Sequence, residues 1–294
     1  MKRTVCFAAI MIALAISTAC ADRGSIPFKP GVEIFEPNQR ALIAWNGEEE
    51  ILLLSTDLAA SESTMVLEVL PLPSEPVVKK GDVEVFAKAT ALINRKLVEK
   101  MTTRGAKGPG EEDEKPAGEV TFHERIGSHD ISVTHVLDET GFVAWVVEYL
   151  DSAGAENPTI PESLKPVVQE YLVEGFKYFV FDVVSLCEEP RTSEAIQYRF
   201  ETDHLYYPLK ITRTETGSTK IDLLVLTPRL LNIFPGISYK RITLPHEPVT
   251  LTGIELWGLN REMYELLGKP KESRLRIWKL GGELASFDKD LLAK

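Results

Sequence analysis

An antiparallel hairpin is the strongest local fold signal in this 294-residue chain. Apolar residues fill Ala41–Trp45 and again Ile51–Leu54, and Asn46-Gly47 lies between the two runs. An Asn-Gly pair accepts positive φ at both central positions of a tight turn, which is what a short hairpin requires. The sequence therefore predicts two antiparallel strands joined at Asn46-Gly47.

Further strand-like segments follow along the chain. Met65–Leu70 is one, and the prolines of Pro71–Pro76 are expected to end it because proline donates nothing to a sheet ladder. The aromatic and β-branched run Phe176–Leu186 has the profile of a buried strand. Other predicted strands cover residues 131–136, 196–200, 206–212, 221–226 and 274–280.

Helical spacing is confined to a few intervals between these strands. Apolar residues recur at helical spacing from Val85 to Leu97, and Asp82 is placed to cap that helix. Two more helices are expected over residues 160–175 and 260–267, whereas residues 141–150 fit a strand or a helix on pattern alone. Runs of strands with a few inserted helices predict an α+β fold built on largely antiparallel sheets.

The first 21 residues have the order of a secretory signal. Met1-Lys2-Arg3 is basic, Val5–Ile16 is apolar, and Ala19-Cys20-Ala21 is small. Cleavage after Ala21 would release a soluble chain that begins at Asp22. In the alternative reading Cys20 is lipidated, although Ser17 replaces the large aliphatic residue usual three positions before such a cysteine. The chain is thus expected outside the cytoplasm, secreted or periplasmic, or else lipid-anchored through Cys20.

Composition limits the remaining choices. The formal net charge of −11 and the absence of a basic cluster argue against nucleic acid, whose binding depends on neutralising phosphates. No other stretch is long and apolar enough to span a bilayer. Beyond the signal only Cys187 is left as a free thiol, so no internal disulfide is expected, and burial is the ordinary state of such a cysteine.

The chain divides into three predicted parts. Residues 1–21 are the signal, 22–228 form the α+β core, and 229–294 form a C-terminal extension packed on it. Within the core, residues 103–119 are polar and acidic, with almost no apolar side chain, and are expected to be a mobile loop. Glu111–Glu114 in that loop lack the alternating oxygen ligands of a calcium site.

Several short motifs resemble one family when they are taken in their order and spacing. The hairpin residues Gln39–Leu52 come first, then Leu70–Pro76, Trp145, Gly175-Phe176, and Phe200–Asp203 before Tyr207-Pro208-Leu209. The chain is similar over residues 22–228 to an uncharacterised secreted prokaryotic family catalogued as domain of unknown function 2330. The resemblance implies a helix at residues 141–150, and it supplies no catalytic residues because the family has no established activity.

No motif identifies a catalytic or metal site. His123, His129 and His135 are six residues apart, but Gly127-Ser128 interrupts any continuous strand and no further ligand completes a zinc set. The chain contains no nucleophile elbow, no phosphate-binding loop and no dinucleotide fingerprint. No cofactor and no metal ligand are therefore predicted, and Glu48–Glu50 are interpreted as a charged hairpin tip.

Two functions of different classes remain open. The favoured one is a non-catalytic secreted or envelope-associated protein that binds another protein or a surface polymer. The alternative is an extracytoplasmic hydrolase or metal-assisted enzyme whose site is assembled only in three dimensions. Pro71–Pro76 is the candidate partner-facing strip, against the simpler interpretation of a rigid strand exit. Trp145 and Tyr206-Tyr207 are candidate groove aromatics, against burial in the core.

Overall fold

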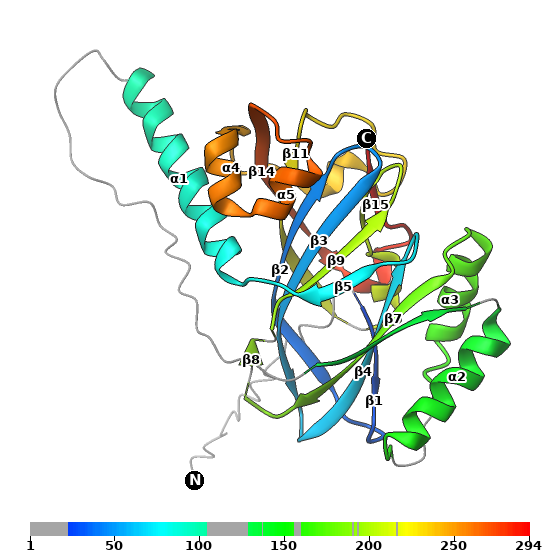
Figure 1. Cartoon of the computed structure of the whole chain (residues 1–294). Helices are drawn as coiled ribbons and strands as arrows, with labels where there is room; N and C mark the ends of the chain where they lie inside the picture. Colours follow the sequence, from blue (N-terminus) through cyan, green and yellow to red (C-terminus); the bar gives the residue numbers. More distant parts are fainter. Residues whose placement is uncertain are drawn as a thin grey trace, which may run out of the picture.

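Two β-sheets packed face to face form the centre of the molecule, and helices cover their outer faces (Figure 1). The computed structural model describes residues 23–104, 129–136, 138–155, 160–189, 191–192, 194–215 and 217–294. The signal with Cys20, His123, the acidic run Glu111–Glu114 and most of the predicted loop 103–119 lie outside these residues.

The larger sheet contains nine strands among the described residues. Its path is β12 (Ile242–Thr243), β14 (Glu272–Glu283), β11 (Ser218–Thr227), β2 (Ile34–Trp45), β3 (Glu49–Ala60), β9 (Ile196–Glu201) and β5 (Val77–Lys80), with β13 (Val249–Thr252) beside β14 and β8 (Arg191–Thr192) beside β3. All pairs are antiparallel except β11 with β2.

The smaller sheets complete the β structure. One has the order β1 (Gly24–Pro27), β4 (Thr64–Leu72), β7 (Tyr178–Leu186) and β6 (Asp130–His135), and β10 (Leu205–Tyr207) pairs with β15 (Leu291–Ala293). The strands β14 and β15 of the last sixty-odd residues thus pair with β11 and β10 from the preceding part of the chain.

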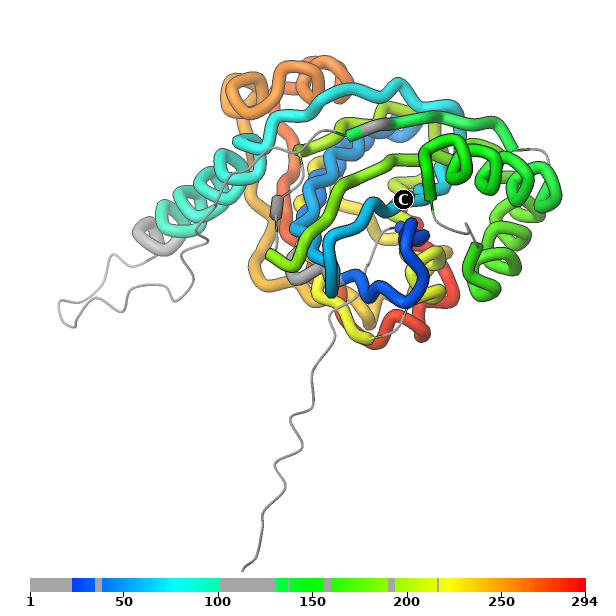
Figure 2. The backbone as a smooth tube through the Cα atoms, turned by 90° about the horizontal axis from the view of Figure 1, so that it is seen from below, coloured from blue at the N-terminus to red at the C-terminus, as the bar shows by residue number. Residues whose placement is uncertain are grey.

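Helices lie on both outer faces, as both views show (Figures 1 and 2). On the large sheet these are α1 (Glu84–Arg104), α4 (Gly253–Leu259) and α5 (Arg261–Leu266); on the four-stranded sheet they are α2 (Glu139–Ser152) and α3 (Leu164–Val173). Side-chain alternation explains the layers, because Ala41 and Ile43 of β2 face the inner core while Leu42 and Ala44 face α1, α4 and α5. The predicted α+β class is confirmed.

Several predicted elements change in detail. The hairpin forms, but Gly47 alone has positive φ, and the Asn46 side chain instead accepts the N–H groups of Glu48 and Glu49. Pro71 lies inside β4 rather than ending it, because β1 pairs only with residues 66–69 and leaves the proline without a ladder partner on that side. Residues 141–150 are helical, as the family resemblance implies.

The predicted strand 206–212 is wrong beyond Tyr207. The chain turns into a short 3-10 helix, η1 (Lys210–Thr214), because the Asp290 carboxylate accepts the backbone N–H groups of Leu209 and Lys210. None of the helices in the described ranges is long and apolar enough to cross a membrane.

Candidate functional site

The residues that the sequence predicts as a possible partner-binding surface, namely Trp145, Tyr206-Tyr207 and Pro71–Pro76, mostly pack in the core. Tyr206 and Tyr207 are fully buried. Trp145 is half-buried and packs on Phe181, with ring centroids 4.2 Å apart. In the strip Pro71–Pro76, the Pro71 carbonyl accepts the Tyr206 hydroxyl at 3.0 Å, and Pro76 is buried. These aromatics and prolines therefore stabilise the fold.

Cys187 differs from the sequence expectation. The thiol is free and only half-buried, and its Sγ lies 3.4 Å from the Glu189 carbonyl oxygen. Cys187 directly follows β7, and the alternation of exposed Ser185 and buried Leu186 turns the Cys187 side chain back toward the exposed side.

His129 contacts an acid that is distant in the sequence. Its Nδ1 lies 2.7 Å from Oδ2 of Asp182 on β7. Arg23 forms an ion pair with Glu68 on β4 and lies 3.7 Å from the same Asp182 oxygen. These four side chains are at most 5% exposed, so a substrate in solvent does not reach them. We call this group the inter-sheet ion cluster.

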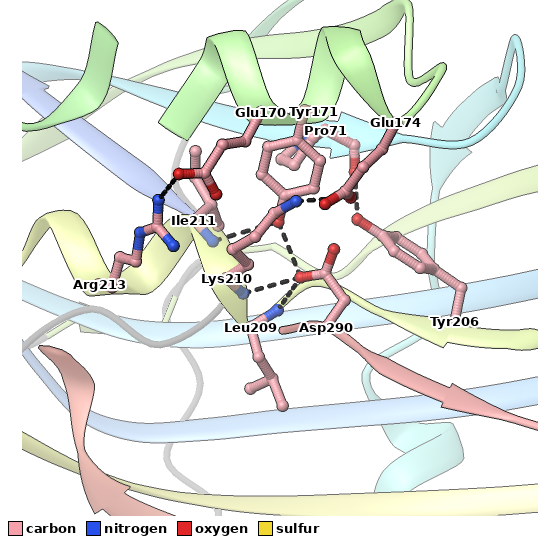
Figure 3. A network of polar contacts seen from close by, with 10 residues as sticks. All are labelled: Pro71, Glu170, Tyr171, Glu174, Tyr206, Leu209, Lys210, Ile211, Arg213 and Asp290. Carbon is pink, nitrogen blue, oxygen red and sulfur yellow. Dashed lines mark hydrogen bonds and ion pairs between the residues drawn. The ribbon is translucent and has the colours of Figure 1, made fainter. Parts of the chain in front are cut away.

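A second buried network surrounds Asp290 (Figure 3). Its Oδ1 accepts the Tyr171 hydroxyl at 2.7 Å and the backbone N–H groups of Leu209 and Lys210 at 2.8 and 2.7 Å. Lys210 Nζ lies 4.0 Å from the Tyr171 ring centroid and donates to Glu174 at 2.6 Å. We call this the Asp290 network, and it joins the C-terminal residues to α3 and η1.

Glu50, the third acid of the predicted charged hairpin tip, points into the inner core. The carboxylate is fully buried, and Oε2 accepts the Tyr206 N–H at 2.7 Å. Burial raises the pKa of Glu50 well above its ordinary value, although the Tyr206 hydrogen bond opposes the rise. Glu49 instead pairs with Arg199 at 2.8 Å, so Glu48–Glu50 do not form one acidic site.

The inter-sheet ion cluster and the Asp290 network were both candidates for a metal site, because each contains buried acids. Within the described ranges, no group of three or more His, Cys, Asp or Glu side chains is arranged to hold a metal ion. His135 stacks on Tyr178 with ring centroids 5.0 Å apart, and so does not join His129 in a common site.

Unlike the buried polar clusters, a groove beside α4 and α5 is open to solvent and is lined partly by exposed apolar side chains. Its volume is about 440 Å³, and it is lined by Thr252, Gly253, Ile254, Trp257, Tyr264, Lys269, Pro270 and Lys271. Ile254 is 84% exposed and Trp257 is 56% exposed, whereas Trp45 and Trp278 are 3% and 6% exposed. We call this the α4–α5 groove. Exposed large apolar side chains around a hollow are typical of an interaction site.

Local backbone chemistry fixes the shape of the α4–α5 groove. Gly253 donates its N–H to the Lys271 carbonyl at 2.9 Å, and a Cβ at this position would lie 2.5 Å from the Pro270 oxygen. After α5, Gly268 and Lys269 both have positive φ, of 77° and 54°. The left-handed region is unfavourable for lysine, so the surrounding hydrogen bonds hold Lys269 at the rim against its local preference.

The helices that carry the groove are anchored by ion pairs and caps. Thr252 and Glu255 form a capping box at the start of α4, and Lys96 of α1 lies 2.8 Å from Glu255. Partial burial would raise the pKa of Glu255, but hydrogen bonds from Lys96 and Thr252 outweigh burial and lower it to about 2. Asn46 at the hairpin tip donates to the Leu266 carbonyl at 3.0 Å. These contacts connect α4 to α1 and α5 to the hairpin tip.

The rim of the groove is basic and unneutralised. Lys269 and Lys271 are exposed, and within the part of the chain that the structure describes neither has an acidic partner. Most other basic side chains around α4 and α5 are paired, as Lys79 with Glu262 and Arg261 with Glu265 illustrate. In a protein of net charge −11, these two ammonium groups favour an anionic partner.

Sequence reasoning did not single out this site. The predicted helix over residues 260–267 covers α5, but hydrophobic spacing alone does not predict α4 and does not distinguish Trp257. A usable signal exists in Thr252-Gly253-Ile254-Glu255, since Thr followed three residues later by Glu is the capping-box pattern. That pattern would have placed Ile254 and Trp257 on a short helix, but not on its exposed side.

The fold and the groove define an α+β protein of two packed sheets with an exposed aromatic and basic groove. The chain belongs to a family of uncharacterised proteins conserved in bacteria, DUF2330, whose model matches residues 16–232. The resemblance inferred from the motifs is confirmed. The α4–α5 groove lies beyond the matched residues.

Other comparisons add little. No curated protein matches the chain significantly. The crystal structure of baculovirus P35 is similar, with a TM-score of 0.45 and 9% sequence identity, covering 91% of this chain and 98% of that one. A similarity at this level carries no argument about function.

Proposed function

We propose that this protein is a non-catalytic binding protein of the cell exterior or envelope, and that its α4–α5 groove holds an acidic segment of another protein. The observation that carries the proposal is the combination at one place of exposed Trp257 and Ile254 with Lys269 and Lys271, which lack acidic partners among the described residues. Tryptophan in a groove is the side chain most enriched among residues that dominate binding energy.

A protein segment fits this groove better than a surface polymer does. Sugar rings stack on flat aromatic faces, but the most exposed apolar side chain here is the aliphatic Ile254, and Pro270 adds a second aliphatic surface. Such a mixed apolar surface suits an apolar side chain of a peptide. The two lysines at the rim suit carboxylates that flank that side chain.

The place of action is part of the same proposal. The basic, apolar and small-residue order of residues 1–21 supports export. Cleavage after Ala21 would leave only Asp22 before Arg23, whose guanidinium is buried between the two sheets. Amino-terminal sequencing of the exported protein should return Asp22. Incorporation of labelled palmitate that is abolished in Cys20→Ser would instead establish the lipid-anchored alternative.

Binding is tested with defined probes. The probes are fluorescein-labelled peptides in which Asp and Glu flank one Leu or Phe, and polygalacturonate serves as an anionic polymer. We expect saturable peptide binding that Trp257→Ala weakens by roughly tenfold, as for a central aromatic anchor. The matched control is Val173→Ala on α3, since Val173 is 76% exposed and outside the groove.

Three results would refute the protein-segment proposal. The first is the absence of binding to any acidic–apolar peptide. The second is an equal loss of affinity in Val173→Ala. The third is groove-dependent binding of polygalacturonate in preference to the peptides, which would assign the groove to a surface polymer instead.

A further inference from the structure

A small pocket lies on the inner face of the large sheet, separate from the α4–α5 groove. Strands β11 and β14 form its floor, with Val225 opposite Arg276 in the register, and the segment 230–244 covers it. The volume is about 80 Å³, far below the roughly 300 to 1,000 Å³ of pockets for drug-sized ligands. The pocket therefore has room for one ring or one branched aliphatic group.

Aromatic rings form one wall of this pocket. Phe234 packs against Trp278 with ring centroids 5.6 Å apart and against Tyr239 with ring centroids 5.0 Å apart. Tyr239 is 49% exposed, so the wall runs from the core to the surface and gives the pocket an open mouth. Leu231 and Leu244 add aliphatic surface on the covering segment. The lining is thus apolar on most sides.

Arg276, Arg274 and Thr227 supply the polar part of the lining, and Arg276 lies beside Trp278 on the same face of β14. Arg276 is half-buried, and its Nε donates to the His246 carbonyl at 2.8 Å. Among the described residues no carboxylate pairs with it, whereas Arg274 on the same face of β14 lies 3.9 Å from Glu272 and also donates to Thr250. An arginine fixed through Nε keeps its two terminal nitrogens for another acceptor.

The neighbouring histidine does not compete for that acceptor. His246 Nε2 accepts the Ile277 N–H at 3.2 Å, which requires an unprotonated nitrogen. Burial lowers the pKa of His246, and the charge of Arg276 lowers it further, so the ring is neutral at neutral pH. Of the two arginines that line the pocket, Arg276 is therefore the one with no carboxylate partner among the described residues, since Arg274 lies near Glu272.

We propose that the pocket binds a carboxylate attached to one aromatic or branched aliphatic group. The apolar group would fill the space beside Phe234 and Trp278, and the carboxylate would accept paired hydrogen bonds from Arg276. Two sources carry this chemistry: a free small carboxylic acid, or the last residue of a peptide chain. The inference is independent of the α4–α5 groove.

The test titrates the purified protein with 3-phenylpropionate, with the tripeptide Gly-Gly-Phe, and with the carboxamide of each, and follows binding by calorimetry. We expect a dissociation constant below about 1 mM for at least one acid, which is within the affinity open to a ligand of this size. Its carboxamide should bind at least about tenfold more weakly. Preference for the propionate or for the tripeptide identifies the source.

Substitutions test whether the acids bind in this pocket rather than elsewhere on the protein. Arg276→Gln should reduce affinity by at least about tenfold, and the control Arg229→Gln, an exposed arginine outside the lining, should leave it unchanged. Tyr239→Ala removes the half-exposed end of the aromatic wall and should weaken binding without depending on a core substitution. The Lys269→Glu/Lys271→Glu variant of the groove should bind both acids normally.

Other outcomes overturn the proposal. One is the absence of saturable binding of both acids up to about 10 mM, the range in which weak specific binding would still be measurable. The others are equal affinity for acid and carboxamide, and affinity unchanged in both Arg276→Gln and Tyr239→Ala.

Discussion

The Asp290 network and the α4–α5 groove both contain lysine and aromatic side chains, but these are buried and paired in the network and exposed at the groove. In the network Lys210 is buried, with its ammonium between Glu174 and the Tyr171 ring, and Asp290 receives three hydrogen bonds (Figure 3). At the groove Lys269 and Lys271 are exposed without acidic partners among the described residues. Buried charge must be compensated within the fold, whereas exposed and uncompensated charge is available to a partner.

The aromatic residues of the two regions differ in the same way, because those of the Asp290 network are buried and that of the groove is exposed. Tyr171 and Tyr206 are fully buried, and burial raises the pKa of both hydroxyls well above the ordinary value, with the nearby Asp290 adding to the rise. Trp257 is more than half exposed. Substitutions in the buried clusters should therefore change stability, and substitutions at the groove should change binding with little effect on stability.

The largest loss in the free energy of unfolding is expected for a substitution in the inter-sheet ion cluster. Arg23→Met leaves Glu68 and Asp182 as two buried carboxylates directly opposite each other across β4 and β7. Breaking a buried ion pair in this way costs about 3 to 5 kcal/mol. Urea denaturation measures the loss, and the control Lys88→Met, which removes two exposed ion pairs with Asp82 and Glu84, should cost less than about 1 kcal/mol. Equal losses in the two variants would contradict the role of burial.

The second-largest loss in the free energy of unfolding is expected for a substitution in the Asp290 network. Asp290→Ala removes the acceptor of three buried donors and should lower the free energy of unfolding by about 3 kcal/mol, since unsatisfied buried groups cost about 1 to 3 kcal/mol. Asp290→Asn keeps one oxygen acceptor, so its free energy of unfolding should fall by clearly less than that of Asp290→Ala. If both variants unfold at the same urea concentration, the oxygen acceptor is not what stabilises the junction.

Glu50 should give a smaller effect that depends on pH. The pKa of this carboxyl is raised in the folded protein, so its contribution to stability is complete below the unfolded pKa of 4.5 and is lost as pH rises toward the folded pKa. Glu50→Gln stays neutral and keeps an acceptor for the Tyr206 N–H. Relative to the unmodified protein, Glu50→Gln should therefore gain stability as pH rises from 4.5 toward 8. A difference that does not change with pH would show that Glu50 titrates normally.

The smallest effect on stability is expected at the groove. Ile254→Ala and Trp257→Ala remove side chains that are 84% and 56% exposed, and surface substitutions of this kind usually change stability by no more than about 0.5 kcal/mol. Thermal unfolding of both variants tests this. A loss comparable to that of Asp290→Ala would mean that the groove is part of the core.

The sequence predicts the parts of this fold that local pattern determines. Apolar runs and turn residues predict the β2–β3 hairpin, and Asp82 accepts the Glu84 N–H at 2.9 Å at the start of α1 as expected. The end of β10 depends on Asp290, some eighty residues away, so no local pattern encodes it. The partner of His129 is likewise distant in the sequence, since it is Asp182 on β7.

The candidate site was less predictable than the fold. Pattern reasoning selects Trp145 and Tyr206-Tyr207 as readily as Trp257, because amino-acid type does not show which aromatic residue the tertiary structure buries. Exposure and the unpaired state of Lys269 and Lys271 are properties of the assembled chain. The division of the core from residues 229–294 and the extracytoplasmic location stay predictions.

The most direct test of the proposed function combines binding with stability in one charge-reversal variant. For Lys269→Glu/Lys271→Glu we predict at least about tenfold weaker binding of the acidic–apolar peptides, with the free energy of unfolding within about 0.5 kcal/mol of the unmodified protein. The matched control Lys220→Glu/Lys289→Glu changes the net charge equally at exposed positions outside the groove lining. Unchanged affinity in the groove variant, or an equal loss in the control, would contradict the account.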